Sequence, residues 1–239
     1  MTKAENIWRA YKMVKQQAEV IRSGFACYGI YQVVGGKYDR MRSESDLEHA
    51  AGLTALVMSF SMWYPELIPA EDRLTFMQTA MIHDLGEIAT GDIPDNGTRD
   101  AAAKDRAELE VMNSFAELLP AAEIKDTLAL FTEFQQRSTR RGKILYLADK
   151  LEAVLQTFFY EAEGRVGWLG LEPSYRPSDR DIEYSDATKD STTASTWSYH
   201  FYQITRELSA EDSEIVDPFI EVLAEAALSV RGKWFDWWK

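Results

Sequence analysis

Apolar residues recur every three to four positions along most of the chain, which is the period of an amphipathic α-helix, while strand-like alternation is scarce. The pattern predicts an all-α fold, a single bundle of about seven to eight helices. The expected helices cover residues 4–21, a segment that starts after 45, a segment from 69 to 84, and residues 100–119, 122–136, 139–163, 196–208 and 210–230.

The helix ends carry recognisable signals. Ser45 and Glu48 have the spacing of a capping box, in which each residue satisfies a backbone N–H of the other.

In the first helix we expect one apolar stripe, made of Ile7, Tyr11, Val14 and Ala18. In the helix over 139–163, five residues share one face: Leu145, Asp149, Glu152, Gln156 and Phe159.

Three stretches lose the helical period. Residues 24–36 contain several glycines and are expected to be irregular, and residues 88–98 are expected to form a loop. Residues 164–195 are rich in Gly, Pro, Ser, Asp and Arg, which predicts a long loop or insertion. No repeat or composition change marks a boundary, so residues 1–239 are predicted to form one domain, with 196–239 as its C-terminal helices.

The composition is that of a globular protein, with 46% hydrophobic and 27% charged residues. No run reaches the roughly 18 apolar residues of a membrane span, and the charged, amphipathic start is unlike a secretory signal. Cys27 is the single cysteine, so no internal disulfide can form. We therefore expect a cytoplasmic protein that makes no contact with membranes.

The net charge of −13 disfavours binding to a nucleic acid polymer, which needs a basic face. The same charge would repel a small phosphate ester. A protein that acts on such a substrate must therefore offset the charge locally, with a metal ion and a few placed arginines or lysines.

Two of the three histidines lie beside carboxylates on predicted helices: His49 follows Glu48, and His83 precedes Asp84. Taken alone, each could be a buried histidine paired with a neighbouring helix. Asp149 adds a carboxylate among apolar residues, where an unpaired charge is costly, although an ion pair with Lys150 would also explain it. Two imidazoles and two carboxylates suit one divalent transition metal, without distinguishing Mn, Co, Fe, Ni or Zn.

Three motifs, in order across residues 42–163, resemble those of the HD-domain 5′-deoxynucleotidases. They are residues 44–49 (ESDLEH), residues 80–94 (AMIHDLGEIATGDIP), and residues 147–156 (LADKLEAVLQ) with a Tyr-Glu pair beyond them. The resemblance implies an HD-domain helical fold, a mononuclear metal site and hydrolysis of phosphate esters. It gives little information on residues 1–41 and 164–239.

Two acidic residues are candidates for catalysis. Glu87 lies one helical turn after His83, close to the metal but outside the ligand set, which suits a general acid or base. A solvated acid at a helix end is the alternative. Asp92 resembles the second conserved acid of the family and could orient water or a sugar hydroxyl, or could simply form a turn.

The candidates for binding phosphate are Arg42, Arg40 and Lys104, of which Arg42 lies where the family places an arginine before the first histidine. The family also has an Arg-Trp or Arg-Gly-Trp element about fifteen residues before that histidine, associated with sugar recognition. Here the corresponding positions read Val33-Val34-Gly35-Gly36. We therefore expect weaker discrimination between deoxyribo- and ribonucleotides.

Two features lie outside the motifs. His200 stands among aromatic residues and is expected to be a core or interface histidine. The aromatic segment 234–238 is expected to cover apolar surface, in this chain or in a partner chain, and a homodimer is left open.

The expected function is metal-dependent removal of phosphate from small phosphomonoesters, nucleoside 5′-monophosphates first among them. Two alternatives share the scaffold: a di-iron oxygenase, and a non-catalytic metal- or nucleotide-binding regulatory module. Residues 85–148 contain no histidine, which disfavours a binuclear centre. The complete set of candidate ligands disfavours the regulatory module.

Overall fold

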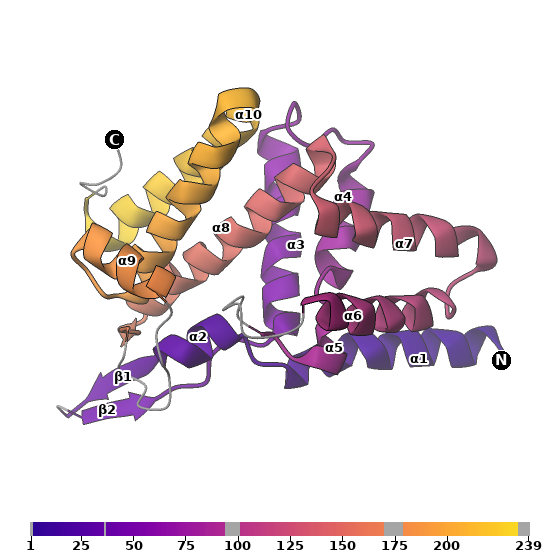
Figure 1. The fold of residues 1–239 in the computed structure, drawn as a ribbon, viewed down its shortest axis with the longest axis horizontal. Coiled ribbons are helices and arrows are strands. Elements are labelled where there is room, and N and C mark those ends of the chain that lie inside the picture. Colours follow the sequence, from indigo (N-terminus) through magenta and orange to yellow (C-terminus); the bar gives the residue numbers. More distant parts are fainter. Residues whose placement is uncertain (1, 36, 94–100, 170–178, 234–239) are drawn as a thin grey trace. The chain divides into compact units, whose positions relative to one another are not determined.

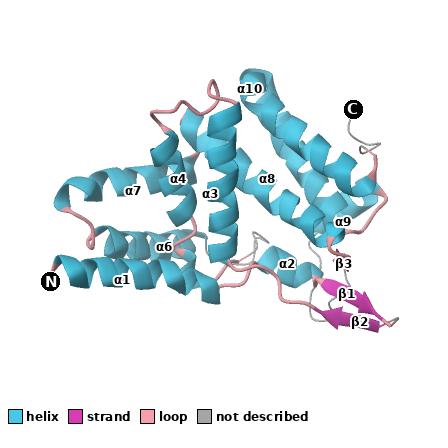
Figure 2. Cartoon of the chain, turned by 180° about the vertical axis from the view of Figure 1, so that it is seen from behind, coloured by secondary structure: helices cyan, strands magenta, loops and turns pink. Residues whose placement is uncertain are grey.

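The computed structural model describes residues 2–35, 37–93, 101–169 and 179–233 of the chain. These residues form ten α-helices, a short 3-10 helix and a small antiparallel sheet (Figures 1 and 2). The predicted all-α fold is confirmed. The structure has more helices than predicted because it includes short helices that the sequence pattern does not reveal. In the described part of the chain, no helix is long and apolar enough to cross a membrane.

The helices group into two compact units. The first unit comprises Met1–Ser23 and Glu44–Tyr146, and the second comprises Gly24–Ser43 and Leu147–Lys239. The boundary between them falls inside one long helix, α8 (Arg140–Ala162). The sequence predicts that residues 1–239 form one domain, and this stays a prediction.

The first unit holds α1 and most of the motif-bearing helices. Within it α3 packs against α4, and α6 contacts both α5 and α7. Its elements are α1 (Lys3–Gln16), η1 (Gln17–Glu19), α3 (Asp46–Trp63), α4 (Arg73–Ile82), α5 (Glu87–Thr90), α6 (Ala101–Ala116) and α7 (Ala121–Gln136).

The second unit combines helices with the sheet. Strand β1 lies between β2 and β3, and the register pairs Tyr31 with Arg40 and with Val166. Its elements, besides the rest of α8, are α2 (Ser23–Tyr28), β1 (Tyr31–Val34), β2 (Lys37–Arg40), β3 (Arg165–Val166), α9 (Asp179–Thr188) and α10 (Thr193–Arg231). Its apolar packing includes Phe25, stacked on Trp197 with ring centroids 4.6 Å apart.

The prediction for residues 24–36 was wrong. Residues 24–28 belong to α2 and residues 31–34 form β1, because β1 finds partners on both sides that no local pattern reveals. Residues 164–195 also contain β3 and α9, and residues 88–90 belong to α5. The two predicted C-terminal helices are both present within α10, where a kink at the non-helical Asp212 separates them.

The predicted apolar stripe of the first helix was also partly wrong. Ile7 is 71% exposed and Tyr11 is 55% exposed, whereas Ala10, Met13 and Val14 pack against the core of the first unit. The buried face of this helix is therefore rotated about the helix axis relative to the predicted apolar stripe. A similar correction applies in α8, where Phe159 is 53% exposed.

Candidate functional site

His49 is held at the start of α3. The capping box is present: the Ser45 side chain accepts from the Glu48 amide, and the Glu48 carboxylate accepts from the Ser45 amide at 2.8 Å. The cap fixes the first helical turn and directs His49 inward, where its side chain is fully buried. Leu53, one turn later, is also fully buried.

His83 follows the last residue of α4 and is 1% exposed. Its Nδ1 lies 2.8 Å from the carbonyl oxygen of Ala80. Because a carbonyl only accepts, Nδ1 must carry the proton, and in the neutral ring Nε2 keeps its lone pair. A ligand histidine is held in this way when its second nitrogen donates to a carbonyl.

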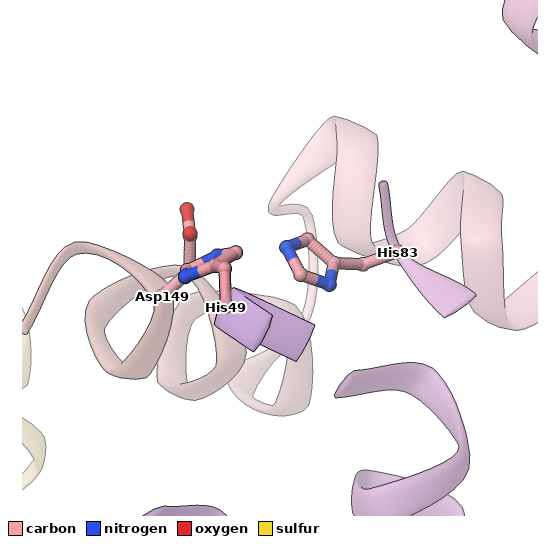
Figure 3. A group of neighbouring side chains, drawn as sticks. All are labelled: His49, His83 and Asp149. Atoms are coloured by element: carbon pink, nitrogen blue, oxygen red, sulfur yellow. The ribbon is translucent and has the colours of Figure 1, made fainter. Parts of the chain in front are cut away.

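Asp84 meets both imidazoles. Its Oδ2 lies 2.9 Å from Nε2 of His83 and 3.8 Å from Nε2 of His49. The rings of His49 and His83, drawn in Figure 3, have centroids 5.2 Å apart. Arg22 donates to the same oxygen at 3.0 Å. Burial opposes ionisation of Asp84, but His83, Arg22 and His49 together hold the pKa of its carboxyl well below its usual range.

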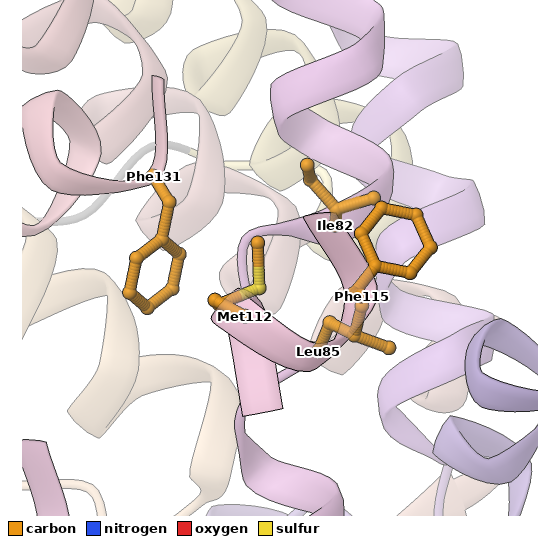
Figure 4. Close-up of a cluster of buried hydrophobic side chains, with 5 residues drawn as sticks. All are labelled: Ile82, Leu85, Met112, Phe115 and Phe131. Carbon is orange, nitrogen blue, oxygen red and sulfur yellow. The ribbon is translucent and has the colours of Figure 1, made fainter. Parts of the chain in front are cut away.

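The His-Asp pair is fixed by the apolar residues on either side of it. Ile82 and Leu85 point into a cluster with three side chains from α6 and α7: Met112, Phe115 and Phe131 (Figure 4). Leu85 is fully buried. The helix break between α4 and α5 is therefore anchored at both ends, which limits movement of the two polar side chains between them.

Glu87 begins the single-turn helix α5 and is 7% exposed. It is not on a continuation of α4, as the sequence analysis had allowed, since α4 ends before His83. Its Oε1 accepts from Nζ of Lys104 at 3.3 Å. Burial, then the nearby carboxylates of Asp84, Asp92 and Asp46, raise the pKa of Glu87 to about 10, against the opposing effect of Lys104.

Lys104 and Glu108 support α5 from α6. Lys104 lies 3.2 Å from Oε1 of Glu108, so it bridges two acids. The Cα, Cβ and Cγ atoms of Glu108 lie so close to Gly86 that a Cβ at that position would clash at under 3 Å. The sequence predicts that Lys104 binds phosphate. In the structure its ammonium group forms ion pairs with the carboxylates of Glu87 and Glu108.

Asp92 and Asp46 lie near Glu87. Asp92 Oδ2 accepts from the Ser23 amide at 2.7 Å. Asp46, the first residue of α3, is fully buried, and burial followed by the charge of Asp84 raises the pKa of Asp46 to about 7. Asp46 is not evident as a site residue from the sequence, because an acid in the first turn of a helix is common.

Arg22 is the cation that the sequence analysis missed. Besides its bond to Asp84, its Nε lies 3.8 Å from Oδ2 of Asp92. The sequence does contain a run similar to the Arg-Gly-Trp element of the family. It is Arg22-Ser23-Gly24-Phe25, in which an arginine is followed by a glycine and an aromatic residue. It lies further upstream than expected, because α2 and the hairpin stand between it and His49.

The other predicted site residues belong to the second unit. Arg40 ends β2 and Arg42 follows it, and both are exposed. Asp149, on α8, is 4% exposed and lies 2.8 Å from Nζ of Lys150. The roles predicted for these three residues remain predictions.

His200 lies on α10, half-buried, with its ring 5.6 Å from that of Tyr184. Burial, and then the positive charge of Lys150 and Arg180, lower the pKa of His200 to about 4. The aromatic segment 234–238 lies outside the described residues.

The donor set of the first unit fits a divalent transition metal. Two histidine nitrogens and an ionised carboxylate oxygen converge, and in the neutral tautomer His83 Nε2 and Asp84 Oδ2 are two acceptors facing each other at 2.9 Å. A metal ion placed between them would satisfy both. Mixed imidazole and carboxylate ligands are typical of Mn, Fe, Co, Ni and Zn.

Two buried imidazoles and a carboxylate that converge between helices are typical of a helical domain that binds a metal ion. The HD domain family matches residues 36–183, more than half of the chain, and the chain belongs to this family. The match confirms the family predicted from the three motifs.

Several curated relatives are named 5′-deoxynucleotidases. HDDC2 of Danio rerio is 26% identical over 166 residues, covering 69% of this chain and 75% of the relative. HDDC2 of Homo sapiens is 27% identical, covering 66% and 70%. The hdd1 protein of Schizosaccharomyces pombe is 33% identical over 100 residues, covering 39% and 49%.

Solved structures share the fold. A protein of Magnetospirillum magnetotacticum, described as a predicted metal-dependent phosphohydrolase, superposes with a TM-score of 0.56 at 16% identity, covering 94% of this chain and 93% of that one. A protein of Pyrococcus horikoshii gives a TM-score of 0.51 at 20% identity, covering 83% and 98%.

Proposed function

We propose that the protein is a metal-dependent phosphomonoesterase that removes phosphate from nucleoside 5′-monophosphates. The observation that carries the proposal is the placement of Asp84 Oδ2 against Nε2 of both His83 and His49. The names of the deoxynucleotidase relatives support the reaction class and the substrate class.

The proposed ligands are His49, His83, Asp84 and Asp149, for one divalent transition metal. Asp149 is included because it stands in the third motif, residues 147–156, in the order that the family shows. Four protein ligands leave coordination positions for water and for a substrate oxygen. When bound, the ion would supply Lewis-acid activation of water and of the phosphoryl group.

The protein groups around this set have separate tasks. Glu87, buried and outside the ligand set, is proposed to move the proton of the attacking water. Arg22 is proposed to hold Asp84 and Asp92 in place, since its guanidinium lies between their two carboxylates. Asp92 is proposed to orient water or a sugar hydroxyl. Arg40 and Arg42 are proposed to contribute further positive charge to phosphate binding.

The substrate proposal is tested with a panel of nucleoside 5′-monophosphates and sugar phosphates, assayed for phosphate release with manganese, cobalt, zinc or magnesium. We expect hydrolysis of nucleotides, with deoxy-over-ribo discrimination of less than about tenfold. A strong deoxy preference would indicate that the Arg22-Ser23-Gly24-Phe25 run replaces the displaced recognition element. Absence of activity on every nucleotide would refute the substrate class.

A cytoplasmic location and a homodimer are part of the same proposal. They rest on the single cysteine and on the aromatic residues of the sequence. Cell fractionation tests the location. Light scattering of the purified chain tests the oligomeric state, and a monomeric mass would refute the dimer.

A further inference from the structure

The small sheet of the second unit, drawn in magenta in Figure 2, presents one of its faces to the core of that unit. The backbone amide of Met41 donates to the carbonyl of Ile30 at 2.7 Å, which extends the pairing of β1 and β2 by one residue. Ile30 is buried within an apolar cluster, and Met41 packs against the same cluster. Because side chains alternate between the two faces of a strand, Tyr31 and Arg40 lie on the opposite face of the sheet.

The opposite face carries three aromatic rings. Tyr38 pairs with Val33 across the strands, so it shares the face of Tyr31. Trp168 stands two residues after Val166, which pairs with Tyr31 from the other side. The ring centroids of Tyr38 and Tyr31 lie 6.3 Å apart, and those of Tyr38 and Trp168 lie 5.8 Å apart, both in edge-to-face arrangement. We call Tyr31, Tyr38 and Trp168 the aromatic face.

Tyr38 stays open to solvent despite these contacts. Its side chain is 55% exposed, and all four residues of β2 are exposed. Tyr31 and Trp168 are half-buried. An edge-to-face contact leaves part of the ring surface uncovered, and tyrosine offers a flat contact area at a low cost in conformational entropy. The aromatic face is therefore suited to accept a further flat ring.

The charge around the aromatic face is positive, in contrast to the charge of the whole chain. Residues 31–42 contain three basic side chains and one acidic side chain, in a protein whose net charge is −13. Arg40 is exposed, and it lies on the aromatic face because it pairs directly with Tyr31. Aromatic rings beside basic side chains suit a nucleotide, whose base stacks on a ring while its phosphate pairs with a cation.

We propose that the aromatic face, together with Arg40, binds the base of a nucleotide, and that Tyr38 supplies the principal stacking ring. Such a site would deepen the proposed function, on which its biological role rests. The roles proposed above concern the metal, the attacking water, the phosphate and a sugar hydroxyl, and they leave the base without a partner. Stacking requires no hydrogen-bond pattern on the base, so the site should accept every base and favour the larger purines.

The competing interpretation is that the three rings only stabilise a short sheet through cross-strand packing. Removal of the Tyr38 ring would then lower the melting temperature and leave the affinity for nucleotides unchanged. The residues of the aromatic face and Arg40 all belong to the second unit, so both interpretations concern that unit alone.

The two interpretations are separated by calorimetric titration of the full chain with a phosphonate analogue of deoxyadenosine 5′-monophosphate. In this analogue a CH₂ group replaces the ester oxygen, so hydrolysis cannot release phosphate. The matching deoxyribose phosphonate, which lacks the base, is titrated in parallel. We expect Tyr38→Ala to weaken binding of the nucleotide analogue by about five- to a hundredfold, the range for loss of one stacking ring. Binding of the base-free analogue should not change.

Two further variants control this measurement. Tyr38→Phe keeps the ring and should bind the nucleotide analogue as the wild type does. Tyr11→Ala is the matched control, because Tyr11 is also 55% exposed but lies on α1 in the first unit. It should bind both analogues normally. Unchanged affinity of Tyr38→Ala for the nucleotide analogue would overturn the proposal, whether or not its melting temperature falls. If Tyr38→Ala also altered the mass found by light scattering, the face would be an interface between copies of the chain.

Photolabelling locates the base without relying on a variant that folds. The 8-azido form of the nucleotide analogue is irradiated with the wild-type chain, and the labelled peptides are identified by mass spectrometry. We expect label in peptides that contain residues 31–40 or Trp168. Label confined to other peptides would overturn the proposal. If Tyr38→Ala lost affinity for both analogues, as a damaged fold would, the position of the label decides.

The result is independent of the hydrolysis assay. Base-dependent binding that requires Tyr38, in a protein that hydrolyses no nucleotide, would refute the proposed function and leave the stacking site standing. Hydrolysis of nucleotides by a protein whose affinity for the analogue does not depend on Tyr38 would refute the stacking site and leave the proposed function standing.

Discussion

Nε2 of His83 lies 2.9 Å from Oδ2 of Asp84, although the bond from Nδ1 to Ala80 leaves Nε2 as an acceptor in the neutral ring. Two acceptors at this separation require a cation or a proton between them. Since the same oxygen faces His49 and Arg22, the pair lies at the centre of the candidate site.

Replacing His83 should remove the transition metal. His83→Ala deletes a nitrogen ligand, so we expect metal affinity to fall by more than about tenfold, measured by elemental analysis after dialysis against limiting metal. His200→Ala changes the same residue type at a half-buried position of the second unit and should retain full metal content. Equal metal content in the two variants would contradict the assignment of His83.

Glu87→Gln should retain the transition metal and the fold but lose most turnover, by about 10²–10⁴-fold. The reason is that the amide keeps the shape of the side chain but cannot accept the proton of the attacking water. Steady-state kinetics and metal content are measured together. Glu110→Gln, an exposed acid on α6, is the control, and a Glu87 variant as active as this control would make Glu87 a structural acid.

Lys104→Met tests whether Lys104 binds substrate or positions Glu87. Because Lys104 is engaged with Glu87 and Glu108, we expect kcat to fall while KM changes little. Loss of the ammonium also removes the group that lowers the pKa of Glu87, so the pH at which activity rises should move upward. An increase in KM with unchanged kcat would instead support phosphate binding.

His200 should make the metal-free protein sensitive to acid. Its pKa is about 4 in the folded chain and about 6.5 when unfolded, so the unfolded state binds the proton more readily. Stability attributable to His200 is therefore complete above pH 6.5 and is lost as the pH falls toward 4. Denaturant unfolding in EDTA at several pH values measures this loss. His200→Gln should flatten the dependence, and an unchanged slope would contradict it.

Arg231 should stabilise the second unit. From the end of α10 it pairs with both carboxylate oxygens of Glu161 at 2.9 Å and 2.6 Å, and it also donates to Ser195 at 2.7 Å. Arg231→Lys keeps the charge but loses the planar two-point pairing, so we expect a loss of about 1–3 kcal/mol in unfolding free energy. Arg206→Lys, on the exposed face of α10, should change stability much less.

The sequence by itself determined the helical fold, the capping box before His49, and most helix bounds, because these depend on local periodicity and caps. It also identified the HD family, since His83, Asp84, Glu87 and Asp149 stand in ordered motifs. Only the tertiary structure brought Arg22 to Asp84 across a long sequence separation, turned Lys104 toward Glu87, and buried Asp46 at the start of α3. These are non-local electrostatic contacts between helices, and local periodicity carries no information about which charged side chains will face one another.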